Sequence, residues 1–93
     1  MIKKLAKMPY AQARVLINPM GTTRLQSYQT IVAVIDEEGW LEINGLYSAT
    51  TRKHLKAFCS EYCGIDLFST IRLLAKEHML YNIHTGEVVE RGE

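Results

Sequence analysis

Residues 27–36, SYQTIVAVID, decide the fold of this chain, because they hold its strongest strand signal. The centre of this stretch, Ile31 to Ile35, is continuously apolar and rich in β-branched residues. A short run of this kind between turn residues predicts an inner strand that is covered on both faces. Residues 36–39, DEEG, predict a hairpin turn, and residues 40–45, WLEING, predict the returning strand with alternating apolar and polar side chains.

The flanking residues predict further strands. Apolar residues alternate with polar ones from Met8 to Ile17, apart from Leu16, which is typical of a half-buried strand. Residues 18–21, NPMG, predict a turn, and the polar residues 22–26, TTRLQ, predict a loop. Near the C-terminus, LYNIHTGEVVE (80–90) has two short arms around Thr85 and Gly86 and predicts a hairpin.

Two helices are predicted between these strands. Ser48 or Thr50 is placed to cap the first helix, and Gly64 to terminate it. Asp66 is placed to cap the second helix. The expected buried stripe of the first helix is Thr51, Leu55, Phe58, Cys59 and Tyr62. That of the second helix is Leu67, Ile71, Leu74 and His78, widened by Phe68 and Ala75.

This order of elements predicts one α+β domain over residues 1–93. We expect a small antiparallel β-sheet with two consecutive helices packed on one face and a C-terminal β-hairpin. The composition, 47% hydrophobic and 23% charged, is that of an ordinary globular protein. No apolar run approaches the ~20 residues that cross a bilayer. The N-terminus starts with basic residues, but Lys4 and Lys7 interrupt the apolar stretch that a secretion signal requires. We therefore expect a cytoplasmic location without membrane contact.

The sequence favours a protein that is not an enzyme. His54 and Cys59 would point roughly 140° apart on an ideal helix, so they make a poor thiol–imidazole pair. Cys59 and Cys63 share a helix face, where the preferred interpretation is packing as reduced thiols. They lack a second ligand pair, so no metal site and no cofactor are predicted.

The start of the first helix offers the best candidate binding surface. Free amides at a helix N-terminus attract anions, and hydroxyl and basic side chains there would add donors. A second polar stripe lies on the following helix, where Arg72 and Lys76 are like charges four residues apart. An acidic partner would offset their repulsion. The candidate binding residues are Thr50, Thr51, Arg52, Lys53, Lys56, Arg72 and Lys76. The alternative interpretation is that these are the solvated faces of ordinary helices.

Two motifs also resemble a known family. Ser-Tyr-x-Thr at residues 27–30 and Tyr-Ser-x-Thr-Thr-x-x-His at residues 47–54 resemble a family of short uncharacterised proteins carried by phages and prophages of gut Firmicutes. The resemblance covers roughly residues 26–63 and the YNIHTGEVVE tail, whereas the first 20 residues contribute nothing to it. It implies a mobile-element protein that acts by binding in the cytoplasm of a bacterial host cell, and it transfers no catalytic residue.

Two hypotheses about function follow. The first is a stoichiometric inhibitor of a host defence nuclease, of the anti-CRISPR type, that occupies a nucleic-acid or partner surface. The second is a DNA- or RNA-binding accessory or regulatory protein. An exposed Leu73 and the edges of a small sheet also allow a homodimer.

Overall fold

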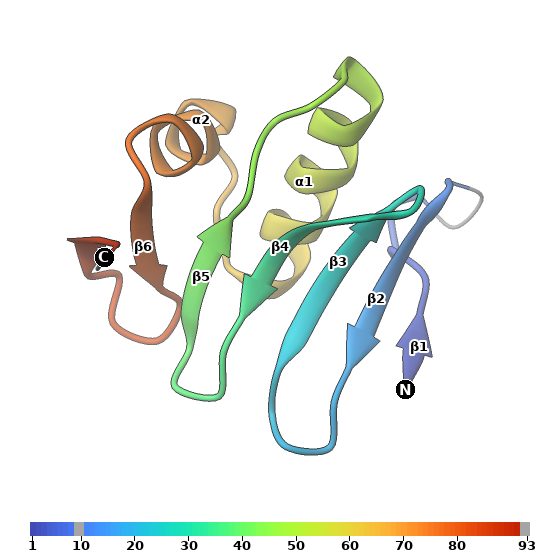
Figure 1. Cartoon of the computed structure of the whole chain (residues 1–93), viewed down its shortest axis with the longest axis horizontal. Helices are drawn as coiled ribbons and strands as arrows, with labels where there is room; N and C mark the ends of the chain where they lie inside the picture. Colours follow the sequence, from blue (N-terminus) through green and yellow to red (C-terminus); the bar gives the residue numbers. More distant parts are fainter. Residues whose placement is uncertain (9–10, 92–93) are drawn as a thin grey trace.

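The computed structural model describes residues 1–8 and 11–91 and contains one antiparallel sheet with two helices (Figure 1). The seven described strands lie in the sheet in the order in which they occur in the chain. The strands are β1 (Ile2–Lys3), β2 (Ala13–Ile17), β3 (Thr23–Ser27), β4 (Thr30–Ile35), β5 (Trp40–Ile43), β6 (Met79–Asn82) and β7 (Val88–Glu90). The helices are α1 (Ala49–Tyr62) and α2 (Phe68–Lys76). The predicted fold class is therefore confirmed, and the C-terminal hairpin extends the same sheet.

The predicted strand over residues 27–36 is two strands in the structure. Ser27 ends β3, and the chain turns at Tyr28, whose φ of 56° lies in the left-handed region that such tight hairpins require. The prediction of a loop at residues 22–26 is wrong, because this segment forms most of β3. Its period of two is carried by Leu25 and Ser27, which are both buried, while polar residues occupy the other face.

The prediction that residues 31–35 are covered on both faces is also wrong. A β-bulge shifts the register between β3 and β4, so that Leu25 pairs with Ala33 and Gln26 with Ile31. Val32 is the extra residue, and it is buried together with its neighbour Ala33. The bulge therefore explains the continuous apolar run without a second covering layer. Both helices lie on one side of the sheet, and the other side is open (Figure 1).

The N-terminal strand is shorter than predicted and has an additional partner. The alternating segment 8–17 becomes β2 only from Ala13, and its residues 9–10 lie outside the described part of the chain. Residues 18–21 form the predicted turn, in which the Gly21 amide donates to the Asn18 carbonyl. Strand β1, which was not predicted, pairs with β2.

The ends of the helices follow the predictions in part. Ser48 caps α1, because its hydroxyl accepts from the Thr51 amide, and Gly64 follows the helix with a φ of 70°. The prediction that Asp66 caps α2 is wrong. Leu67 occupies the N-cap and is exposed, so it does not extend the buried stripe of that helix.

The core lies between the helices and the sheet. The predicted stripe of α1 is buried apart from a half-buried Tyr62, and Ile71, Leu74 and Ala75 bury the matching face of α2. Phe58 is the largest fully buried side chain and packs against Tyr62 with ring centroids 5.1 Å apart. This burial of one stripe leaves the basic residues of both helices on the opposite, outward side.

Candidate binding cleft

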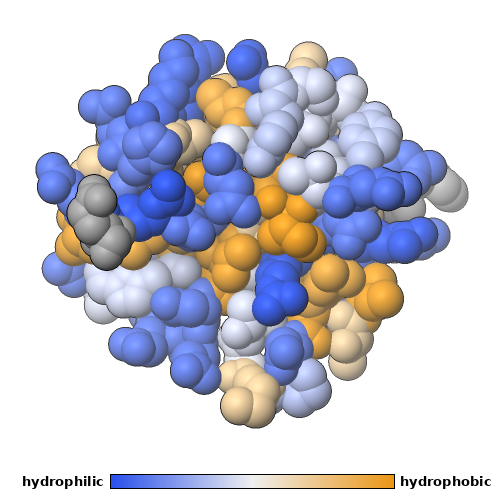
Figure 2. Space-filling model, viewed as in Figure 1, coloured by the Kyte–Doolittle hydropathy of each residue, from blue (hydrophilic) through white to orange (hydrophobic). Residues whose placement is uncertain are grey.

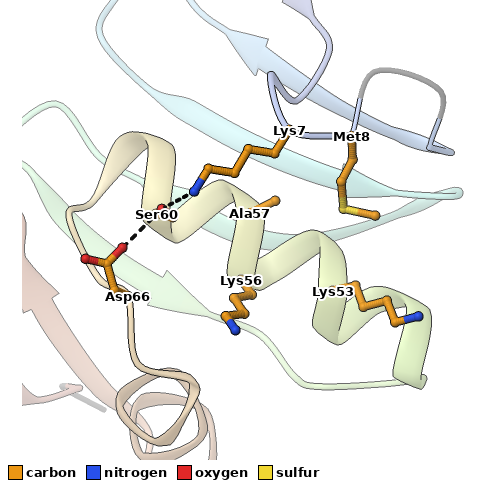
Figure 3. Close-up of a pocket in the computed structure, with 7 residues that line it drawn as sticks. All are labelled: Lys7, Met8, Lys53, Lys56, Ala57, Ser60 and Asp66. Atoms are coloured by element: carbon orange, nitrogen blue, oxygen red, sulfur yellow. Dashed lines mark hydrogen bonds between the residues drawn. The ribbon is translucent and has the colours of Figure 1, made fainter.

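A cleft of about 330 Å³ lies between the outer face of α1 and the segment that follows β1 (Figure 3). Apolar atoms dominate its floor, where the Met8 side chain reaches toward α1 beside Ala57. Lysines from both segments stand around this floor. The cleft is lined by Lys7, Met8, Lys53, Lys56, Ala57, Ser60 and Asp66.

Contacts between the N-terminal segment and α1 position the cleft. The fully buried Leu5 anchors the segment in the core, and the Ala6 amide donates to the Glu61 carboxylate at 2.9 Å. The Lys7 ammonium donates to the Ser60 hydroxyl at 3.0 Å, and that hydroxyl donates to Asp66 at 3.1 Å (Figure 3). Asp66 thus stabilises the end of the cleft instead of capping α2.

The cleft carries a positive charge that acids of the described chain do not neutralise. Three lysines and one carboxylate, that of Asp66, line it. Within the described residues, the single ion pair closer than 4.0 Å joins Arg91 to Glu42, which are not cleft residues. Lys53 and Lys56 are exposed, so their ammonium groups are available to an anion. An apolar floor with a cationic rim suits a ligand that presents an apolar group flanked by acids.

The binding residues predicted from the sequence lie at several different places in the structure. Lys53 and Lys56 line the cleft, whereas Arg52 and Thr50 are exposed on α1 outside it. Thr51, expected among the anion donors, is only 4% exposed and points into the core.

The basic residues of α2 form a second surface. Arg72 and Lys76 line a shallow depression of about 260 Å³ together with Leu73, which is 51% exposed. The Arg72 guanidinium lies over the Phe68 ring, 5.5 Å from its centroid, which orders this side chain. Arg72 and Lys76 thus lie in a different depression from Lys53 and Lys56.

A buried polar network behind α1 was missed in the sequence. The Ser27 hydroxyl lies 3.0 Å from Thr51 Oγ1 and 2.8 Å from His54 Nδ1. Ser48 donates to Thr51 as well, at 3.3 Å. These contacts fit a chain in which Ser48 donates to Thr51, Thr51 donates to Ser27, and Ser27 donates to His54 Nδ1. Each hydroxyl then has one acceptor, and the proton of the neutral imidazole is on Nε2. The spacing of Thr51 and His54, three residues apart on a helix, indicates that the two side chains share a face. Their partner Ser27 could be found only after residues 22–26 had been recognised as part of a strand.

This network binds the helix to the sheet and is closed to substrates. Ser27 is 2% exposed and His54 is 0% exposed, so a serine–imidazole pair is present without access from solvent. His54 Nε2 has no hydrogen-bond partner among the described residues, and the Tyr28 ring lies 5.8 Å away, centroid to centroid. Burial lowers the pKa of His54 below its ordinary value of 6.5.

We expect this histidine to make the protein less stable in acid. Between the ordinary pKa and the lowered folded-state pKa, the unfolded chain binds a proton that the folded chain does not. The free energy of unfolding should therefore fall as the pH drops below about 6.5, by at most about 1.4 kcal/mol per pH unit. Urea unfolding between pH 7.5 and 5 measures this slope, and His54→Gln should flatten it. An unchanged slope in that variant would assign the effect to other groups.

Other site chemistries receive no support within residues 1–8 and 11–91. Cys59 and Cys63 are free and buried in the core, in keeping with the packing interpretation. The described residues contain no cluster of three or more His, Cys, Asp or Glu side chains that could hold a metal ion. In the same part of the chain, neither helix has the length and hydropathy to span a membrane.

Comparison with known proteins gives one match. Residues 1–71 match the model of a family of unknown function, DUF8033. The matched region includes the first 20 residues and contains β1 to β5 and α1, but it ends within α2. No curated protein and no solved structure matches the chain.

Proposed function

The chain belongs to DUF8033, a family of unknown function, and we propose from its geometry that it is a non-catalytic binding protein. The cleft on α1 is the proposed binding site, and an acidic segment of a partner protein is its occupant. The observation that carries the proposal is the apolar floor of Met8 and Ala57 beneath three lysines that form no ion pair within the described chain.

The shape of the cleft favours a protein segment over a nucleic acid. A volume of about 330 Å³ accommodates one or two apolar side chains, and Met8 can adjust to their shape. The lysines at the rim would then meet carboxylates on either side of the apolar anchor. Among residues 1–8 and 11–91, no aromatic side chain lines this cleft for stacking against a base.

Lys53→Glu combined with Lys56→Glu should weaken the binding of an acidic segment. A suitable probe is a labelled peptide, EDELEDE, with EDESEDE as the peptide that lacks the apolar anchor. Reversing two rim charges replaces attraction by repulsion, so we expect the affinity for EDELEDE to fall at least tenfold. Fluorescence anisotropy measures the affinity, and backbone NMR shifts locate the bound peptide.

Arg72→Glu combined with Lys76→Glu is the matched control, because it also reverses two charges, on α2 and outside the cleft. It should leave the affinity for EDELEDE within about twofold. Equal binding of both peptides would contradict the role of the apolar floor. An equal loss of affinity in the control would show that the overall charge of the protein, and not the cleft, determines binding.

A nucleic-acid surface is the second candidate, because the basic residues of both helices are exposed and form no ion pair in the described chain. These residues are Arg52, Lys53, Lys56, Arg72 and Lys76. In the same titrations with a DNA duplex, this candidate requires affinity that falls steeply with salt. Arg52→Ala and Lys56→Ala should then each reduce the salt slope by about one. The peptide proposal requires tighter binding of EDELEDE than of DNA at 150 mM salt.

The proposed setting is a phage or prophage protein that inhibits a host defence nuclease in the bacterial cytoplasm. The cleft would bind an acidic segment of the nuclease in a stoichiometric complex. Expression in cells with a CRISPR-type nuclease should restore phage plating by at least tenfold. The Lys53→Glu and Lys56→Glu variant should lose this protection, while the Arg72→Glu and Lys76→Glu variant should retain it. Full interference at saturating wild-type protein would contradict the inhibitor role.

A further inference from the structure

One row of side chains crosses the whole open side of the sheet. Pairing in register joins Ile2 to Leu16, Leu16 to Arg24, Arg24 to Val34 and Val34 to Glu42. Leu41 pairs with Tyr81, so Glu42 lies beside Leu80, and Leu80 pairs with Val89. The cross-sheet row, from β1 to β7, is Ile2, Leu16, Arg24, Val34, Glu42, Leu80 and Val89.

The row lies on the side opposite the helices. The residues next to it along the strands, such as Val15, Leu25 and Leu41, are fully buried beneath the helical layer. Because side chains alternate across a strand, the row itself points to the other side. That side faces the viewer in Figure 2, where apolar side chains gather at its centre among hydrophilic ones. Val34 and Leu80 are half-buried and Arg24 is exposed.

The order of the row is symmetric about the central strand β4. Val34 stands at the middle, with a cation on one side and an anion on the other, and two apolar residues beyond each charge. In a face-to-face pair, the two-fold axis lies between the two sheets and runs parallel to β4. Rotation by 180° about this axis places β3 of one copy opposite β5 of the other, and β2 opposite β6. The rotated row therefore places Arg24 over Glu42 of a second copy, Leu16 over Leu80, and Val34 over Val34.

We propose that two copies of this chain dimerise face to face through the cross-sheet row. Charge complementarity selects the second copy as occupant, because the same surface supplies both Arg24 and Glu42. Six strand intervals of about 4.8 Å make the row about 29 Å long, so it spans most of the molecule, whose longest extents are 33 and 30 Å. Packed sheets lie about 10 Å apart, which allows these side chains to interdigitate.

Glu42 can accept a contact from Arg24 of a second copy in addition to its ion pair with Arg91. Arg91 donates to Glu42 Oε2 at 2.8 Å, and Oε1 has no hydrogen-bond partner among the described residues. Arg24 forms no ion pair in that part of the chain either. Two symmetric Arg24–Glu42 pairs would fix the register of an otherwise apolar contact. The outer strands are short, two residues in β1 and three in β7, which disfavours pairing through the sheet edges.

The arrangement leaves both binding clefts free. The helices lie on the far side of each sheet, so a face-to-face dimer presents one cleft outward from each copy. The dimer is thus independent of the proposed ligand, and either proposal can fail without the other.

Sedimentation velocity of the full chain from 2 to 200 µM tests the dimer. We expect a concentration-dependent shift to twice the 10.6 kDa mass of the chain. Val34→Glu and Val34→Lys each place like charges on the two-fold axis and should each weaken self-association by at least about tenfold. An equimolar mixture of the two variants should restore a dimer, which proves that both variants are folded. Trp40, the single tryptophan, points to the same open side as Glu42, and its emission should shift to the blue on association.

Val88→Glu is the matched control, because this exposed valine of β7 pairs with Tyr81 and lies outside the row. It should leave the dimer unchanged. A wild-type chain that stays monomeric at 200 µM would overturn the proposal. So would a dimer that survives Val34→Glu, or one that is lost on Leu73→Glu instead.

Discussion

Replacement of Phe58 by alanine should lower the free energy of unfolding by about 3–5 kcal/mol. The Phe58 ring is fully buried between α1 and the sheet and packs against Tyr62. Its removal forfeits the transfer of a large apolar group and leaves a cavity that the two rigid layers cannot close. Urea unfolding monitored by circular dichroism measures the loss.

Phe68→Ala makes the same change at a half-buried position on α2 and is the matched control. We expect a smaller loss, of about 1–2 kcal/mol, because part of that ring already contacts solvent. Equal losses at the two sites would mean that α1 is not the principal contact between the helical layer and the sheet.

Ser27→Ala should lower the free energy of unfolding by about 2–3 kcal/mol, although it removes a single oxygen atom. The Ser27 hydroxyl is hydrogen-bonded to His54 Nδ1 at 2.8 Å and to Thr51 Oγ1 at 3.0 Å. Its loss leaves a fully buried imidazole without a hydrogen bond on either ring nitrogen in the described structure. Thermal and urea unfolding at pH 7.5 measure the change.

A double-mutant cycle separates the network from the packing. Replacing both partners by apolar groups removes the unsatisfied imidazole, so Ser27→Ala with His54→Leu should be more stable than Ser27→Ala alone. Ser69→Ala, at an exposed position of α2, should change the stability by less than about 0.5 kcal/mol. A double variant whose loss equals the sum of the two single losses would refute coupling between Ser27 and His54.

The helices were predictable because their signals are local. The 3.6-residue period of α1, its Ser48 cap and its Gly64 terminator all lie within one short segment. The strand β3 was not, because polar residues fill the open side of its alternation and only Leu25 and Ser27 of its other side are buried. The error at residues 31–35 has a similar cause. A bulge that buries two successive residues has the same sequence pattern as a strand covered on both faces.

Part of the candidate site was predictable for the same reason. Lys53 and Lys56 follow from the outward face of α1, which the helical period fixes. Lys7 and Met8 were not associated with them, because they are about fifty residues away in the chain. Their position depends on the burial of Leu5 and on the contacts of Ala6 and Lys7 with α1. Asp66 was assigned to a helix cap because the sequence does not show its contact with Ser60.

The sequence by itself determined the fold class, the two helices, the buried stripe of α1 and the basic character of the outer helix faces. Of the stripe predicted for α2, Leu67 and His78 are exposed. The features that the sequence determined depend on period and on local capping, which a linear pattern displays directly. The tertiary structure alone decided three others: the cleft at Lys7, the closed network of Ser27, Thr51 and His54, and the cross-sheet row. Each requires the register of strands or contacts between distant segments, and pairing across a sheet is fixed by the packing of the whole core.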